Sequence, residues 1–154
     1  MAANGAPRYT LVGDYSTNST ITSSATMGPT LTAAAADFTG VSANNAKVFT
    51  GDSANGSRLV GLHFEAIGTN AQSVARIYIN NGGSAATASN NVLVGQLTLP
   101  ATTTSATTGV GTADYYFPGP SGYADIPPAF TVLVGLGTLV AAGWVVTPIL
   151  GGKF

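Results

Sequence analysis

The chain has 154 residues, enough to bury a hydrophobic core as one domain. Only 7% of its residues are charged, against about 25% in ordinary soluble domains, and the net charge is −1. The five basic residues are scattered, which excludes the concentrated positive charge that nucleic-acid binding needs. The absence of cysteine excludes disulfides and thiolate metal sites. So few charges indicate a surface that is either coated with small polar residues or covered by other protein chains.

Residues 1–46 are rich in small polar residues, and residues 15–36 carry no charge. One interpretation is an extended N-terminal arm that becomes ordered against a neighbouring chain, because such a composition buries little apolar surface of its own. The other is a pair of irregular strands around residues 20–22 and 30–34. The first ten residues lack the charged and apolar regions of a secretory signal, so we expect synthesis in a cytoplasm.

Residues 47–154 are expected to form a β-sandwich domain. Apolar residues at every second position predict strands, and Gly, Pro and Asn mark the turns between them. In the second strand, Val60, Leu62 and Phe64 are expected on one face. Residues 123–128 are expected to be a connection. The predicted strands are 47–50, 58–67, 73–80, 91–99, 114–117, 130–138 and 144–149. With no convincing amphipathic helix, this pattern favours an all-β fold, a single antiparallel sandwich of the jelly-roll type.

The stretch from Phe130 to Leu150 is mostly apolar and long enough to cross a membrane as a helix. Three glycines interrupt it, however, and Pro148 would break its last turn. Its β-branched residues favour strands. We therefore predict that this stretch forms a hairpin of the last two strands and has no membrane partner.

Few residues suggest chemistry. His63 is the one histidine and would have to be the base of any Ser-His-Asp triad, but no Gly-x-Ser-x-Gly motif accompanies it. We expect His63 to be a surface or interface residue. The segment from Asp52 to Gly56 resembles the opening of a calcium loop but lacks the closing acidic ligand, so a turn is expected. We predict no enzyme activity, no catalytic residue, no metal and no cofactor.

Four aromatic residues, Tyr115, Tyr116, Phe117 and Tyr123, lie in a segment rich in Pro and Gly. They could form a rigid recognition loop for a protein or a sugar, since aromatic residues anchor interfaces. The other interpretation, which we favour, is that these aromatic residues close the edge of the sandwich. The candidate interface residues are Arg8, Tyr9, Tyr15, Tyr116, Phe117 and Tyr123.

Several segments of the last two thirds of the chain resemble one family. These are NGSRL at 55–59, AIGTN at 66–70, RIYINNG at 76–82, LTLPATT at 97–103 and LGTLVAAGWVVT at 136–147. In this order they resemble a family of small tailed-bacteriophage virion proteins of the head decoration, or cement, type. None of these segments has a catalytic motif, so the resemblance favours a structural component of a virus particle.

The resemblance implies a protein that binds the outer surface of the head and stabilises contacts between major capsid subunits, commonly as a trimer. Its partners would be the major capsid protein and two further copies of itself in a homotrimer, without nucleic acid or membrane. Its location would be the outer capsid surface of the virion. The alternative is a tail, fibre or adsorption component with a carbohydrate- or receptor-binding face. A non-viral binding module or an enzyme is a third hypothesis.

Overall fold

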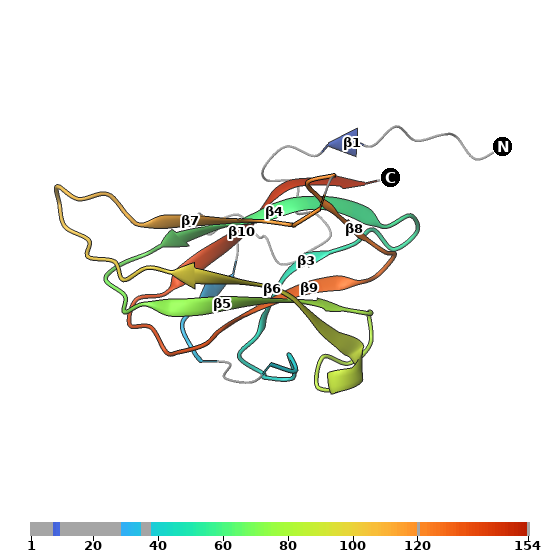
Figure 1. Ribbon diagram of the computed structural model, residues 1–154, viewed down its shortest axis with the longest axis horizontal. Coiled ribbons are helices and arrows are strands. Elements are labelled where there is room, and N and C mark those ends of the chain that lie inside the picture. Colours follow the sequence, from blue (N-terminus) through green and yellow to red (C-terminus); the bar gives the residue numbers. More distant parts are fainter. Residues whose placement is uncertain (1–7, 10–28, 35–37, 120, 154) are drawn as a thin grey trace.

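The computed structural model describes residues 8–9, 29–34, 38–119 and 121–153. They form two antiparallel sheets packed face to face, which confirms the all-β sandwich (Figure 1). No helix in this described part of the chain has the length and hydropathy needed to cross a membrane.

Each sheet draws its strands from distant parts of the chain. Sheet A contains β1 (Arg8–Tyr9), β2 (Thr30–Leu31), β4 (Ser57–Ala66), β7 (Thr112–Tyr116), β8 (Ala124–Ile126) and β10 (Trp144–Lys153). Sheet B contains β3 (Ala46–Thr50), β5 (Ser73–Asn80), β6 (Asn91–Leu99) and β9 (Thr131–Leu136). A 3-10 turn, η1 (Ala88–Asn90), precedes β6.

The pairing of the strands is nested. β2 pairs with β10, β3 with β9, β4 with β7 and β8, and β5 with β6, so early strands lie beside late ones. In sheet A, β10 lies between β2 and β4, and the order in sheet B is β3-β9-β5-β6. This is the connectivity of a jelly roll, in which a long hairpin is rolled into two sheets.

The predicted hairpin of the last two strands is wrong. Both strands exist, but β9 pairs with β3 and β5 in sheet B, whereas β10 pairs with β4 in sheet A. The residues between them therefore cross from one sheet to the other. A local turn signal shows where strands end but not which strands pair, because pairing depends on residues far away in the sequence.

Both edges of sheet A consist of interrupted strands. β7 and β8 follow one another along β4, so three of the residues 123–128, predicted to be a connection, form a strand instead. On the other side, β2 and β1 lie along the two ends of β10. The N–H of Val146 donates to Pro29 O on this side. The backbone nitrogen of Pro148, two residues later in the strand, points to the same side. Pro148 is tolerated in β10 because the ladder of β4 lies on the opposite side.

The core lies between the sheets. Trp144, Phe64, Leu59, Leu62 and Ile77 are fully buried in it. From Leu62 to Ala66, buried residues of β4 alternate with less buried ones as predicted. Before Gly61 the alternation is shifted by one position, because Leu59 is fully buried and Val60 only half-buried. A Cβ at Gly61 would overlap the carbonyl oxygen of Tyr115, so the change of face occurs where a glycine admits a close backbone approach.

Part of the first 46 residues belongs to the sandwich. Leu31 of β2 is 3% exposed and lies in the core, while positions 20–22 lie outside the described residues. Backbone pairing of β1 with β10 adds a second contribution from this region. The domain boundary at residue 46 and the N-terminal arm stay predictions.

Tyr115 connects the two sheets. Pairing between β5 and β6 shifts register after Ile77, which leaves Val94 in a bulge. The Tyr115 hydroxyl donates to Val94 O at 3.2 Å, and the ring contacts Phe117 edge-to-face at 5.3 Å between centroids. Burial raises the pKa of the Tyr115 phenol. Gly95 leaves the space that this ring occupies, because a Cβ there would overlap it.

Candidate functional site

Three loops meet at one end of the sandwich, on the left of Figure 1. They are residues 67–72 between β4 and β5, residues 100–111 between β6 and β7, and residues 137–143 between β9 and β10. We call these three segments the loop platform. None of them contains Asp, Glu, Lys or Arg.

The loop platform exposes large apolar side chains. Ile67 is 53% exposed, Val110 45% and Leu139 70%, so each loop contributes one. They are half of the exposed large apolar residues in the described part of the chain, and the loops at the opposite end contribute none. Exposed apolar side chains on loops without charged residues make this end of the sandwich a candidate surface for protein contact.

The loop platform is held together by one buried asparagine. Asn70 is 2% exposed, and its Oδ1 accepts the N–H groups of Ala142 at 2.9 Å and Gly143 at 2.8 Å. Its Nδ2 donates to the carbonyl oxygens of Gly143 at 3.0 Å and Gly68 at 3.2 Å. The side chain thus joins two of the loops with its full hydrogen-bonding capacity.

Thr102 connects the third loop to the same point. Backbone N–H groups of Asn70 and Thr102 each donate to the carbonyl oxygen of the other, at 3.1 and 2.9 Å. The Thr102 hydroxyl donates to Gly68 O at 2.8 Å and accepts from Asn70 N. All three loops are therefore fixed relative to one another by hydrogen bonds of 2.8–3.2 Å, and those made by side chains are buried or partly buried.

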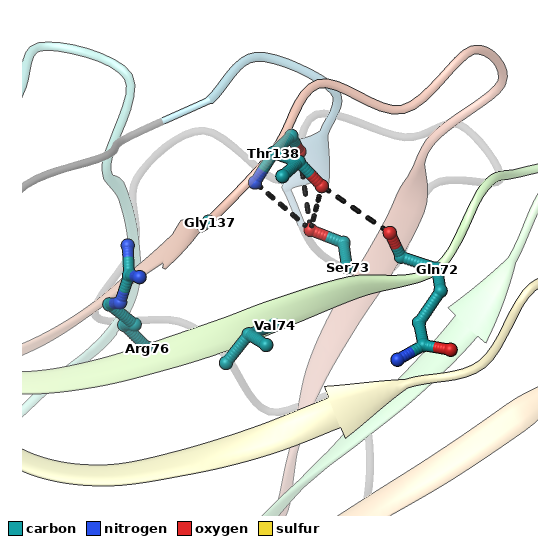
Figure 2. Close-up of a pocket in the computed structure, with 6 residues that line it drawn as sticks. All are labelled: Gln72, Ser73, Val74, Arg76, Gly137 and Thr138. Atoms are coloured by element: carbon teal, nitrogen blue, oxygen red, sulfur yellow. Dashed lines mark hydrogen bonds between the residues drawn. The ribbon is translucent and has the colours of Figure 1, made fainter.

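A further set of bonds attaches the loop after β9 to β5. Figure 2 shows Ser73 and Thr138 facing one another. Thr138 N donates to Ser73 Oγ at 3.2 Å, and the Thr138 hydroxyl lies 3.1 Å from the same oxygen. A pocket of about 230 Å³ lies beside them, lined also by Gln72, Val74, Arg76 and Gly137. The Arg76 guanidinium lies against the Phe38 ring at 4.2 Å, next to this pocket.

A second group of polar residues lies on the outer face of sheet A. His63 of β4 pairs in register with Asp114 of β7 and Thr147 of β10. The His63 Nδ1 and Asp114 Oδ1 are 2.5 Å apart, and both side chains are partly exposed. Together with Thr147, Pro148 and Ile149 they line an open pocket of about 310 Å³. The sequence predicted a surface histidine but gave no sign of its partner, 51 positions away.

The aromatic cluster divides between the core and the surface. Tyr115 is half-buried, and Phe117 is 5% exposed and packs in the core, which agrees with aromatic residues closing the edge of the sandwich. Tyr116 points outward and is 58% exposed. The Arg58 guanidinium lies 3.6 Å above the Tyr123 ring and contacts Asp125 at 3.2 Å.

The candidate interface residues thus have different environments. Tyr116 is open to a partner, Tyr123 is half-buried with Arg58 over one face of its ring, and the burial of Phe117 leaves little of its ring to contact a partner. Arg8 and Tyr9 form β1, for which only the backbone is described, and Tyr15 lies outside the described residues. Sequence reasoning did not identify Ile67, Val110 and Leu139, whose one common sign was their position in uncharged loops.

The segment from Asp52 to Gly56 is a turn, as predicted. Asp52 Oδ1 accepts the N–H groups of Ala54 at 3.0 Å and Asn55 at 3.1 Å, so this oxygen stabilises the turn itself. Within the described ranges, no three His, Asp or Glu side chains are grouped so that they could hold a metal ion. Comparison of the chain with protein-family models, curated proteins and solved structures finds no match.

Proposed function

We propose that this protein is a bacteriophage head decoration protein whose loop platform binds the major capsid protein and stabilises contacts between capsid subunits. The observation that carries the proposal is the combination of three features in one surface. The loop platform has no charged residue, exposes one large apolar side chain from each loop, and is cross-linked by Asn70.

Each feature favours stable contact with another protein. The centres of protein interfaces are depleted of charge, because ionised groups are costly to remove from water. Side chains such as Leu139 gain free energy when a partner covers them. Loops already fixed by hydrogen bonds lose little conformational entropy on binding, which leaves more of that gain as affinity.

The resemblance of residues 55–153 to virion proteins provides the identity of the partner. On a head surface, many copies would each make a modest contact with a regular array of capsid subunits. If the protein is a trimer, its three copies also act at high effective concentration, which strengthens attachment without any new contact.

The alternative is a tail, fibre or adsorption component. One observation favours it: Tyr116 and Asp114 lie two positions apart on β7, and both are exposed. An aromatic ring beside a carboxylate can stack on a sugar and accept its hydroxyl groups. Cryo-electron microscopy of phage particles separates the two functions, because this alternative places the density on the tail.

A binding experiment tests the loop platform directly. Leu139→Asp places a charge at its most exposed apolar position, and Val92→Asp is the matched control, because Val92 is 61% exposed on β6. Both variants should keep the stability of the parent protein. Co-sedimentation with capsids that lack the protein should show about tenfold weaker binding for Leu139→Asp, which corresponds to about 1.4 kcal/mol, and no change for Val92→Asp.

Equal binding by Leu139→Asp and the parent protein would show that the loop platform is not the docking surface. Particle maps without copies of the protein on the head would remove the proposed function altogether.

A further inference from the structure

The outer face of sheet A presents a row of hydrogen-bonding side chains across three strands. Asp114 on β7, His63 on β4 and Thr147 on β10 occupy matching register positions, so their side chains are neighbours on one surface. All three line the pocket of about 310 Å³. This volume is at the lower end of ligand pockets, which span about 300–1,000 Å³, and suits a side chain or a small molecule.

The contact with Asp114 fixes the orientation of the imidazole. A carboxylate oxygen only accepts hydrogen bonds, so the His63 Nδ1, 2.5 Å from Asp114 Oδ1, carries the proton. In the neutral ring, Nε2 is then an acceptor. The pocket therefore offers His63 Nε2, a carboxylate and the Thr147 hydroxyl as acceptors.

One carboxylate lines this pocket, and a second lies close by on the same strand as His63. Glu65 is exposed two positions after His63 on β4, and no ion pair of Glu65 occurs within the described residues. The nearest basic residue on the same strand, Arg58, is held by Asp125 and lies over the Tyr123 ring. Among the described charged side chains, Asp114 and Glu65 lie nearest to the pocket in the register of the sheet, which favours a cation over an anion.

The remaining wall is apolar. Pro148 and Ile149 of β10 line the pocket beside the polar row. A pocket with acceptors on one side and hydrocarbon on the other matches a long basic side chain, whose apolar stem and charged end need different surroundings. Arginine suits it best, because its planar guanidinium has five N–H donors for several acceptors at once.

We propose that the His63–Asp114 pocket receives an arginine side chain from a partner protein. The inference depends on the proposed function only for the origin of that side chain, which would be the major capsid protein. The pocket lies on the outer face of sheet A, whereas the loop platform lies at the end of the sandwich, so one copy would contact its partner through two surfaces.

The experiment uses His63 as its own reporter, because it is the only histidine of the chain. The purified protein is titrated with N-acetyl-arginine methylamide while the imidazole signals are followed by NMR. N-acetyl-citrulline methylamide is the matched probe, with nearly the same shape and no charge. The arginine probe should shift the His63 signals saturably, and the citrulline probe at least tenfold more weakly.

Variants locate the binding. Asp114→Asn and Glu65→Gln should each weaken the arginine probe severalfold, whereas Asp125→Asn, on the same face but bound to Arg58, should leave it unchanged. Added salt should weaken binding, as for any partly exposed charge pair. Equal shifts with both probes, or full binding by Asp114→Asn, would overturn the pocket assignment.

These results are independent of the particle experiment. The probe titration uses the isolated protein. If that protein binds the arginine probe but no copies are found on heads, only the proposed function is rejected. Attachment to heads together with no response to the arginine probe rejects only this inference.

Discussion

Replacing Asn70 by alanine should destabilise the whole fold, although the residue lies in a loop. Its side chain makes four hydrogen bonds of 2.8–3.2 Å, to Ala142 N, Gly143 N, Gly143 O and Gly68 O. Alanine keeps the backbone bonds to Thr102 but removes all four side-chain bonds. The N–H of Gly143 is then buried without a partner, whereas the Gly143 carbonyl oxygen still accepts the N–H of Ile67 at 3.1 Å.

The magnitude follows from burial. A buried group that loses its partner costs about 1–3 kcal/mol, whereas a hydrogen bond that water can replace contributes about 0.5–1.5 kcal/mol. Gly143 is buried, and Ala142 and Gly68 are half-buried, so water can reach only part of the vacated site. We expect the free energy of unfolding to fall by about 2–4 kcal/mol.

The measurement is equilibrium unfolding in urea, with the parent protein and Asn90→Ala alongside. Asn90 also makes two side-chain hydrogen bonds, but it is only half-buried and both bonds lie at the exposed surface, in the loop at the opposite end of the sandwich. Its replacement should cost less than about 1 kcal/mol, because water takes over its bonds. The slope of unfolding free energy against urea should stay the same, so that the midpoint alone reports stability.

A loss for Asn70→Ala no larger than that for Asn90→Ala would refute this reasoning. It would mean that the loops are fixed by their own backbone contacts and that the buried amide contributes little.

Two further predictions concern Tyr115 and its surroundings. Gly95→Ala should lower the unfolding free energy by about 1–3 kcal/mol, because the added Cβ overlaps the Tyr115 ring, whereas Gly109→Ala, with open space around it, should be nearly neutral in the same urea experiment. Burial raises the pKa of Tyr115 above its usual 10.0, so the unfolded chain releases this proton first as the pH rises. The stability that the buried phenol contributes is complete below pH 10.0 and is lost as the pH rises through the raised pKa. Between about pH 9 and pH 11, the free energy of unfolding should therefore fall less for Tyr115→Phe than for the parent protein. An identical loss in both proteins would contradict this assignment.

The sequence predicted most strands because their signals are local. β5 and β6 begin and end as expected, since alternating apolar residues end at turn residues such as Asn81 and Pro100. β8 was missed because three residues between Gly122 and Pro127 are too few to show a period. The pairing of β9 was mistaken because its neighbours, β3 and β5, precede it by many residues.

The candidate sites were harder to predict, because they depend on contacts between distant residues. Asn70 falls between two predicted strands with nothing in the sequence to distinguish it, and its binding partner Gly143 lies 73 positions later. His63 and Asp114 meet only because β4 and β7 pair in one register. No local pattern contains this information, whereas the low charge of the loops could be read directly from their composition.

The nested strand order has a consequence for synthesis on the ribosome. β10 separates β2 from β4 in sheet A and provides Trp144 and Val146 to the core, yet it follows every other strand in the chain. Until it emerges, Leu59, Leu62 and Phe64 of β4 lack one of their two neighbouring strands, because only β7 and β8 on the other side have been made. The nascent chain therefore completes sheet A only after residues 144–153 have emerged, and its apolar strands depend on rapid closure, or on chaperones, to avoid aggregation in that interval.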